Sequence, residues 1–244
     1  IIDFGSDVIF KEEGHKYIHV KSGKELISTN SLISLYKNPF DPDGSILKKK
    51  AAEREISEKE LQKEWTEKKD NACAFGVDFH EEIEYYINKK KIRKSLHSEG
   101  VKQFSKIKFR GKLQSELRIF NLDLGIAGTV DIVDTFEDNT INLLDIKTNA
   151  KIYEYAPWAK RMFYPLDHLI DVNYNHYTLQ MSIYCYILDC AGYWINDLIM
   201  LHYNKETQKL KKYDMEYRKK DVINMINYYK NGSSNKNQDI FEDF

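Results

Sequence analysis

The chain is poor in cysteine, carries almost no net charge and has no long apolar run, and each absence excludes a class of protein. The three cysteines cannot all pair, and their spacing matches no zinc or iron–sulfur motif. We interpret Cys73, Cys185 and Cys190 as reduced core residues of an intracellular, cytoplasmic protein. The chain has no run of about 18 apolar residues, which excludes a transmembrane helix and a membrane as partner.

The 244 residues are 42% hydrophobic and 31% charged, a composition typical of a globular protein with a real core. A net charge of −1 does not mark the whole molecule as a nucleic-acid binder. The charge is unevenly distributed, however, because residues 89–112 contain ten basic side chains and one acidic one, Glu99. Such a segment either follows the phosphates of a nucleic acid or forms a solvated helix face.

Periodicity and turn residues predict one α/β domain, a mixed sheet flanked by helices, with no boundary that splits residues 1–244. It divides into N-terminal strands and helices (1–71), a core (72–230) and a polar, mobile tail (231–244). In the N-terminal part we expect short strands within 7–30, a loop at 38–44 and one or two helices within 45–69. The further helices are expected at 77–90, 98–108, 173–190 and 219–230, and an irregular segment at 149–172. The further strands are expected at 113–121, 124–134, 140–148, 194–203 and 209–217.

The stretch INLLDIKTNAK, residues 141–151, ends an apolar strand with Asp145 and Lys147. Successive side chains of a strand point to opposite faces, so these two share one face, roughly 6–7 Å apart, while Ile146 takes the other. On its own this pattern is more typical of a surface ion pair at a strand end than of a functional site.

Asp131 lies on the preceding predicted strand, and a hairpin can bring it close to Asp145. Two carboxylates in one desolvated site repel each other unless a cation lies between them. Oxygen ligands favour Mg²⁺ or Mn²⁺, and Lys147 on the same face reaches towards a phosphate oxygen. These groups are the minimal equipment for metal-assisted hydrolysis of a phosphodiester.

The motif GTVDIVD…LLDIKT resembles the PD-(D/E)XK nuclease superfamily, and specifically a phage-type member of its RecB-like exonuclease branch. Three more motifs of that branch occur in the expected order, and together the matches span residues 72–190. They are Gly76, His80 and Glu84 in AFGVDFHEEIE, Glu116 in SELRIF, and Gln180 with Tyr184 in QMSIY.

The resemblance implies a restriction-endonuclease-like core and a role for each matching residue. His80, Asp131, Asp145 and the Ile146 carbonyl would hold the metal, and Lys147 would be the catalytic lysine. Glu116 would assist the metal or the attacking water, and Gln180 and Tyr184 would hold DNA or buttress the site. Glu84 would orient the His80 imidazole or cap a local network. In the basic segment, Lys89 and Arg93 are the candidate nucleic-acid contacts.

The function implied is a Mg²⁺- or Mn²⁺-dependent deoxyribonuclease, an exonuclease acting on DNA ends or single strands. It would act in the cytoplasm, a host's if phage-encoded, beside recombination or replication proteins. A non-catalytic nucleic-acid-binding subunit on the same fold and a ribonuclease are the alternatives. The four cysteines that hold an iron–sulfur cluster in some relatives are absent, so no cluster is expected. A zinc-protease helix is excluded because Glu84 stands where the second histidine must be.

Overall fold

An eight-stranded mixed sheet forms the centre of the protein, as the sequence predicts for an α/β fold. The computed structural model describes residues 7–11, 16–39 and 44–239. The strand order is β1-β2-β3-β5-β6-β7-β8, and β4 pairs with β5 outside this path. The strands are β1 (Val8–Lys11), β2 (Lys16–His19), β3 (Glu25–Ser28), β4 (Lys112–Asn121), β5 (Ile126–Thr135), β6 (Thr140–Lys147), β7 (Trp194–Asn204) and β8 (Lys209–Asp214).

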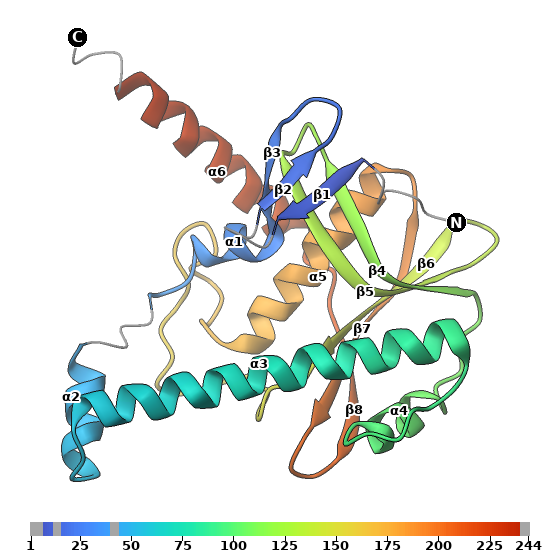
Figure 1. Ribbon diagram of the computed structural model, residues 1–244. Coiled ribbons are helices and arrows are strands. Elements are labelled where there is room, and N and C mark those ends of the chain that lie inside the picture. The colour runs from blue at the N-terminus through green and yellow to red at the C-terminus, as the bar shows by residue number, and fades with distance from the viewer. Residues whose placement is uncertain (1–6, 12–15, 40–43, 240–244) are drawn as a thin grey trace.

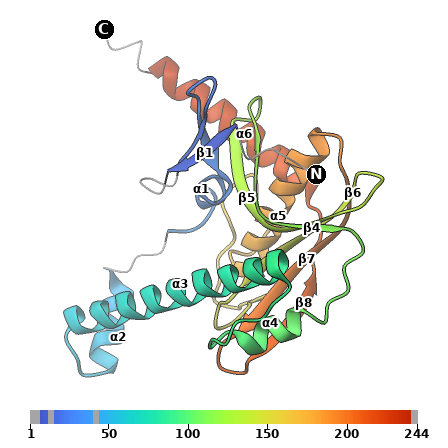
Figure 2. The same cartoon turned by 45° about the vertical axis from the view of Figure 1, so that its right-hand side comes forward.

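Helices cover both faces of this sheet (Figures 1 and 2). They are α1 (Thr29–Ser34), α2 (Ser45–Glu53), α3 (Glu58–Lys89), α4 (Ser98–Phe104), α5 (Asn173–Cys190) and α6 (Lys219–Asp239). The alternation along β6 determines which helix meets which side chain. Ile141 and Leu143 pack in the cluster that contains α5 and α6, whereas Leu144 and Ile146 pack in the cluster that contains α3 and α4.

Strand β5 changes partners along one of its edges. It pairs with β3 in parallel at Ile126 and Ala127, and with β6 in antiparallel from Ile132 to Thr135. The hairpin predicted between the two central strands is therefore confirmed. Between these two ladders, in the segment that includes Gly128 and Asp131, neither β3 nor β6 pairs with this edge of β5, and side chains lie there instead.

Helix α3 is one continuous helix of 32 residues, where the sequence predicted a separate helix at 77–90. Ser57 and Glu60 form a capping box at its start, and no proline interrupts it before Lys90 ends it in the left-handed region. Only its second half packs on the sheet, through Phe75, Phe79, Ile83 and Ile87. Its first half packs against α2, where Leu61 meets Leu47 and Ala51.

Three other predicted boundaries were wrong. Helix α4 ends at Phe104 rather than at residue 108, because the amides of Lys106 and Ile107 donate to carbonyls three residues back and no longer continue the α-helical ladder. Strand β8 ends at Asp214, before residue 217. Helix α6 continues through Asp239, into the stretch predicted as a polar tail, since no proline stops its backbone ladder. Residues 40–43 of the predicted loop and 240–244 of the tail lie outside the described residues.

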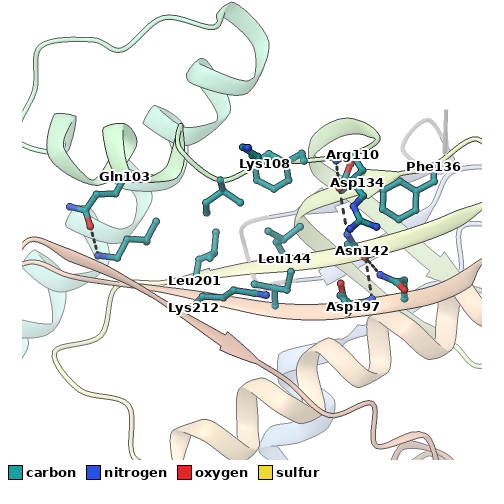
Figure 3. A pocket seen from close by; sticks show the side chains of 15 residues that line it. Gln103, Lys108, Arg110, Asp134, Phe136, Asn142, Leu144, Asp197, Leu201 and Lys212 are labelled. Carbon is teal, nitrogen blue, oxygen red and sulfur yellow. Dashed lines mark hydrogen bonds between the residues drawn. The ribbon is translucent and has the colours of Figure 1, made fainter.

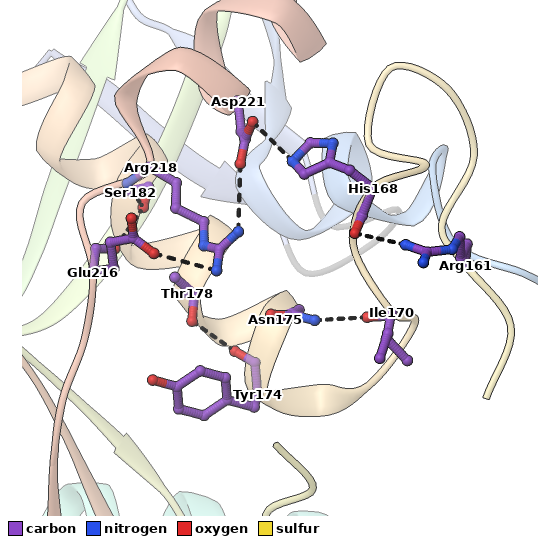
Figure 4. Close-up of polar contacts among 10 residues, drawn as sticks. All are labelled: Arg161, His168, Ile170, Tyr174, Asn175, Thr178, Ser182, Glu216, Arg218 and Asp221. Carbon is purple, nitrogen blue, oxygen red and sulfur yellow. Dashed lines mark hydrogen bonds and ion pairs between the residues drawn. The ribbon is translucent and has the colours of Figure 1, made fainter. Parts of the chain in front are cut away.

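The segment 149–172 is irregular, as predicted, but polar contacts tie it to the start of α6 (Figure 4). The Arg161 guanidinium donates to the His168 carbonyl over 2.9 Å, and the His168 ring lies 3.2 Å from the Asp221 carboxylate. Asp221 in turn pairs with Arg218, which also pairs with Glu216. This segment is therefore held in one place beside the sheet. Within the described ranges, every helix is too short or too polar to cross a membrane.

His97 is a buried histidine with an unusual environment. It is 2% exposed, its ring lies 4.5 Å from that of Phe75 and 5.7 Å from that of Phe79, and neither ring nitrogen has a hydrogen-bond partner among the described residues. Burial lowers the pKa of His97, and the opposing effect of the Asp78 and Glu82 carboxylates is smaller.

We expect His97→Leu to flatten the dependence of stability on pH. Because the folded state holds His97 neutral, the unfolded chain binds an extra proton as the pH falls below about 6.5, and stability is lost there by at most about 1.4 kcal/mol per pH unit. Urea unfolding of both proteins between pH 5 and 8 measures this, and an equal slope in the two proteins contradicts it.

Candidate metal and active site

The candidate site lies where β5 changes partners, at the end of β6. The pairing of Ile132 with Leu144 places the next position, Asp131, across from Asp145. Asp131 accepts a hydrogen bond from the Ile146 amide over 2.6 Å. The hairpin therefore brings Asp131 and Asp145 to the same place, as expected.

Asp145 and Lys147 are not a surface ion pair. The Asp145 side chain is 2% exposed and that of Lys147 is 17% exposed, and the ammonium lies 2.7 Å from Oδ2 of Asp145. Burial raises the pKa of Asp145 to about 6 against the lowering effect of Lys147. Burial also acts to lower the pKa of Lys147, but the carboxylates of Asp145 and Asp131 outweigh it, and the net shift is upwards. Oδ1 of Asp145 has no hydrogen-bond partner in the described part of the chain.

His80, Glu116 and Asp131 form a cluster of potential metal ligands, with one ligand atom from each within 4.8 Å of the others. Nδ1 of His80 lies 3.8 Å from Glu116 and 3.7 Å from Asp131, and its Nε2 lies 3.2 Å from the Ile146 carbonyl oxygen. Burial lowers the pKa of His80, but Asp131 and Glu116 raise it more, to about 9. The imidazolium therefore compensates carboxylates that lie too close together to remain charged alone.

Two local features of the backbone bring His80 and Glu116 close to each other. A Cβ on Gly76 would lie 3.1 Å from the Thr148 hydroxyl, so the glycine lets α3 pass close to the end of β6 and brings His80 to the Ile146 carbonyl. Glu116 has a φ of 51°, in the left-handed region, and interrupts the β4–β5 pairing between Ser115 and Leu117. A left-handed conformation is costly for a residue with a side chain, and here it accompanies the close approach of Glu116 to His80.

Gln180 and Tyr184 approach the carboxylates from α5. They are 8% and 4% exposed, and the Gln180 amide donates to the Tyr184 hydroxyl over 2.9 Å. A Cβ on Gly128 would lie 2.5 Å from the Tyr184 ring, so that glycine makes room for the tyrosine against β5. The sequence left open whether Gln180 and Tyr184 hold DNA or buttress the site, and their burial fits the buttressing role.

Asp145, predicted as a metal ligand, is not one of the three residues of this cluster, and Glu84, Lys89 and Arg93 do not join it either. Glu84 lines a hollow with His80 and Glu116, but no hydrogen bond joins it to His80 among the residues described. Lys89 is exposed at the end of α3, about 13 Å along the helix axis from His80. Arg93 pairs with Glu82 over 3.1 Å and covers the Tyr85 ring. Contact of Lys89 and Arg93 with nucleic acid stays a prediction.

Sequence reasoning missed Tyr177. The Lys147 ammonium lies 4.8 Å from the centre of the Tyr177 ring, and the tyrosine hydroxyl donates to the Asn149 side chain over 2.7 Å. Tyr177 therefore holds the lysine and the turn that follows it. The available signal was spacing, because Tyr177, Gln180 and Tyr184 recur at three- and four-residue intervals on one face of a helix.

We expect the metal-free protein to lose stability as the pH rises through about 9. A pKa raised from 6.5 to about 9 means that protonated His80 contributes fully below pH 6.5, on the order of 3 kcal/mol, and that this contribution is lost above pH 9. Guanidinium unfolding in EDTA between pH 6 and 9.5 measures it. His80→Gln removes the titrating group, so an unchanged pH profile in that variant contradicts the assignment.

Comparisons with known proteins identify no family. No protein family and no curated protein matches the sequence. Among solved structures, one described as the crystal structure of SSO0001 matches with 15% identity and a TM-score of 0.38, over 85% of this chain and 75% of that one. A likeness at this level carries no argument about fold or function.

Proposed function

We propose that this chain is a divalent-metal-dependent deoxyribonuclease with a PD-(D/E)XK core of the RecB-like type. The observation that carries the proposal is the convergence of two strand carboxylates, a helix imidazole and a buried lysine at one point of the sheet. A structural ion pair needs only one acid for each base, whereas here Glu116, Asp131 and Asp145 surround two cationic side chains. The surplus of acid is what a divalent cation would neutralise.

The donor set fits Mg²⁺ or Mn²⁺. Asp131, Asp145 and the Ile146 carbonyl offer the oxygen ligands that these ions prefer, and His80 adds a nitrogen. Oδ1 of Asp145 is buried without a hydrogen-bond partner in the described ranges, which is costly unless a cation takes it. When bound, the ion supplies Lewis-acid chemistry, which lowers the pKa of water and neutralises charge on the phosphate.

In this proposal Lys147 is the residue that stabilises the charge on the reacting phosphate. Its pKa is raised, so it remains cationic, and Tyr177 and Asp145 hold its ammonium in one place. A fixed cation beside the scissile phosphate stabilises the negative charge that develops in the transition state. Glu116 is more exposed than the other acids, with 42% of its side chain accessible, and so is placed to orient the attacking water.

The segment 149–172, which directly follows Lys147, offers a path for a single strand. Four of its aromatic side chains are between 48% and 72% exposed, namely Tyr155, Trp158, Phe163 and Tyr164. Stacking of unpaired bases on exposed rings, with lysines at the phosphates, binds single strands without reading their sequence. This supports action on DNA ends or single strands.

Asp145→Asn and Lys147→Met should each reduce hydrolysis of labelled DNA by about 10²-fold or more, because the first removes a charged ligand of the proposed metal and the second removes the cation beside the phosphate. Excess EDTA should abolish activity of the wild type. The matched control is the exposed Lys16–Glu25 ion pair between β2 and β3, whose Lys16→Met and Glu25→Gln variants should retain activity. Wild-type rates for a folded Lys147→Met protein contradict the proposed role.

The substrate is identified by comparing end-labelled linear, circular and RNA substrates of matched sequence. We expect mononucleotides from linear DNA and no cleavage of circular DNA or RNA. Cleaved RNA would support the ribonuclease alternative. If no substrate is cleaved and calorimetry detects no Mn²⁺ binding, the non-catalytic subunit replaces the nuclease.

A further inference from the structure

A second hollow lies on the opposite face of the sheet from Asp145 and Lys147 (Figure 3). Its floor is apolar and comes from β6, β7 and β8, through Leu144, Ile199, Leu201 and Leu210. The segment between α4 and β4 forms its other wall, where Ile107 and Phe109 are partly buried against the same cluster. Because neighbouring β6 residues point to opposite faces, Leu144 lines this hollow while Asp145 faces the candidate active site.

The rim of the hollow is basic. Lys108 and Arg110 alternate with the inward Ile107 and Phe109 and are exposed, and neither has an ion-pair partner among the residues described. Two acids also line the hollow: Asp134 is 1% exposed and accepts from the Gly111 amide over 2.8 Å, and Asp197 is exposed, so Lys108 and Arg110 outnumber the one exposed carboxylate. An apolar floor under free cations suits a ligand that combines carboxylates with large apolar side chains.

The chain itself contains such a segment. Residues 239–244 read Asp-Ile-Phe-Glu-Asp-Phe, with three acids, no base and three large apolar side chains. The segment follows α6, which packs with α5 on the other face of the sheet and leads away from the body in Figure 1. Five residues beyond Asp239 span at most about 18 Å, and α6 packs on the other face of the sheet from the hollow, which favours the segment of a second copy as the occupant.

We propose that this hollow binds residues 239–244 of a second copy of the chain, with a phenylalanine on the apolar floor and the carboxylates at Lys108 and Arg110. The contact joins two different surfaces, so it is head-to-tail, and copies joined in this way form a closed ring or a chain. The proposal does not depend on the proposed nuclease function, because no group of the candidate active site takes part.

Sedimentation velocity of the full chain across a range of concentrations tests the assembly. The wild type should associate as its concentration rises, and the paired substitutions Lys108→Glu with Arg110→Glu, or Phe241→Ser with Phe244→Ser, should weaken association at least tenfold. The paired control is Lys59→Glu with Lys63→Glu, on the exposed first half of α3, which should associate like the wild type. A wild type that remains monomeric at all concentrations overturns the proposal.

Mixing the two double variants distinguishes loss of the contact from loss of the fold. The hollow variant is Lys108→Glu with Arg110→Glu, and the segment variant is Phe241→Ser with Phe244→Ser. The hollow variant retains its acidic segment and the segment variant retains its hollow, so an equimolar mixture should restore one head-to-tail contact and yield a heterodimer. A fluorescent Asp-Ile-Phe-Glu-Asp-Phe peptide should bind the segment variant, and the peptide Asn-Ile-Ser-Gln-Asn-Ser should not. No heterodimer, or equal peptide binding by the hollow variant, overturns the proposal.

Discussion

The structure around the candidate site depends on the burial of the Asp145 carboxylate beside Lys147. A carboxylate that is 2% exposed is tolerable only with compensation, and the ammonium at 2.7 Å provides it. Since breaking such a pair leaves an uncompensated buried charge, both residues are fixed to one face of β6. Asp131 adds a second carboxylate across the hairpin, and His80 then brings a second cation from α3. With Glu116 added, three acids face two cations, and this surplus of acid is the basis of the proposed metal site.

The sheet makes room for this cluster by letting β5 change partners. In an uninterrupted ladder the edge beside Asp131 would be filled by a neighbouring strand, whereas here β3 ends before that point and β6 pairs only beyond it. The opening lets the Asp131 side chain reach the Ile146 amide and lets Tyr184 lie over Gly128. The left-handed backbone at Glu116, on the other edge of β5, is a local cost at the same place, as is common where function sets the geometry.

The sequence predicted the parts of this site that depend on short-range order. Alternation in INLLDIK puts Asp145 and Lys147 on one face, and a short turn makes the β5–β6 hairpin, which brings in Asp131. His80 is 51 residues upstream of Asp131, and only the family resemblance linked it to the strands. The continuity of α3 and the contact of Tyr177 with Lys147 were missed, because both follow from which surfaces meet in three dimensions and not from the local pattern.

A net charge of −1 hides an uneven distribution of charge over the two faces of the sheet. Asp145 lies on the α5 face of β6, whereas Lys108 and Arg110 border the hollow on the α3 and α4 face. These two side chains belong to the segment 89–112, for which the sequence left a phosphate track and a solvated helix face open, and they lie on the opposite face of the sheet from Asp145. The exposed rings of the segment 149–172 directly follow Lys147 along the chain, and their place is fixed through the contacts of Arg161, His168 and Asp221. In the two functions proposed above, a single strand would stack on these exposed rings, whereas Lys108 and Arg110 on the opposite face would bind the acidic segment of a second copy.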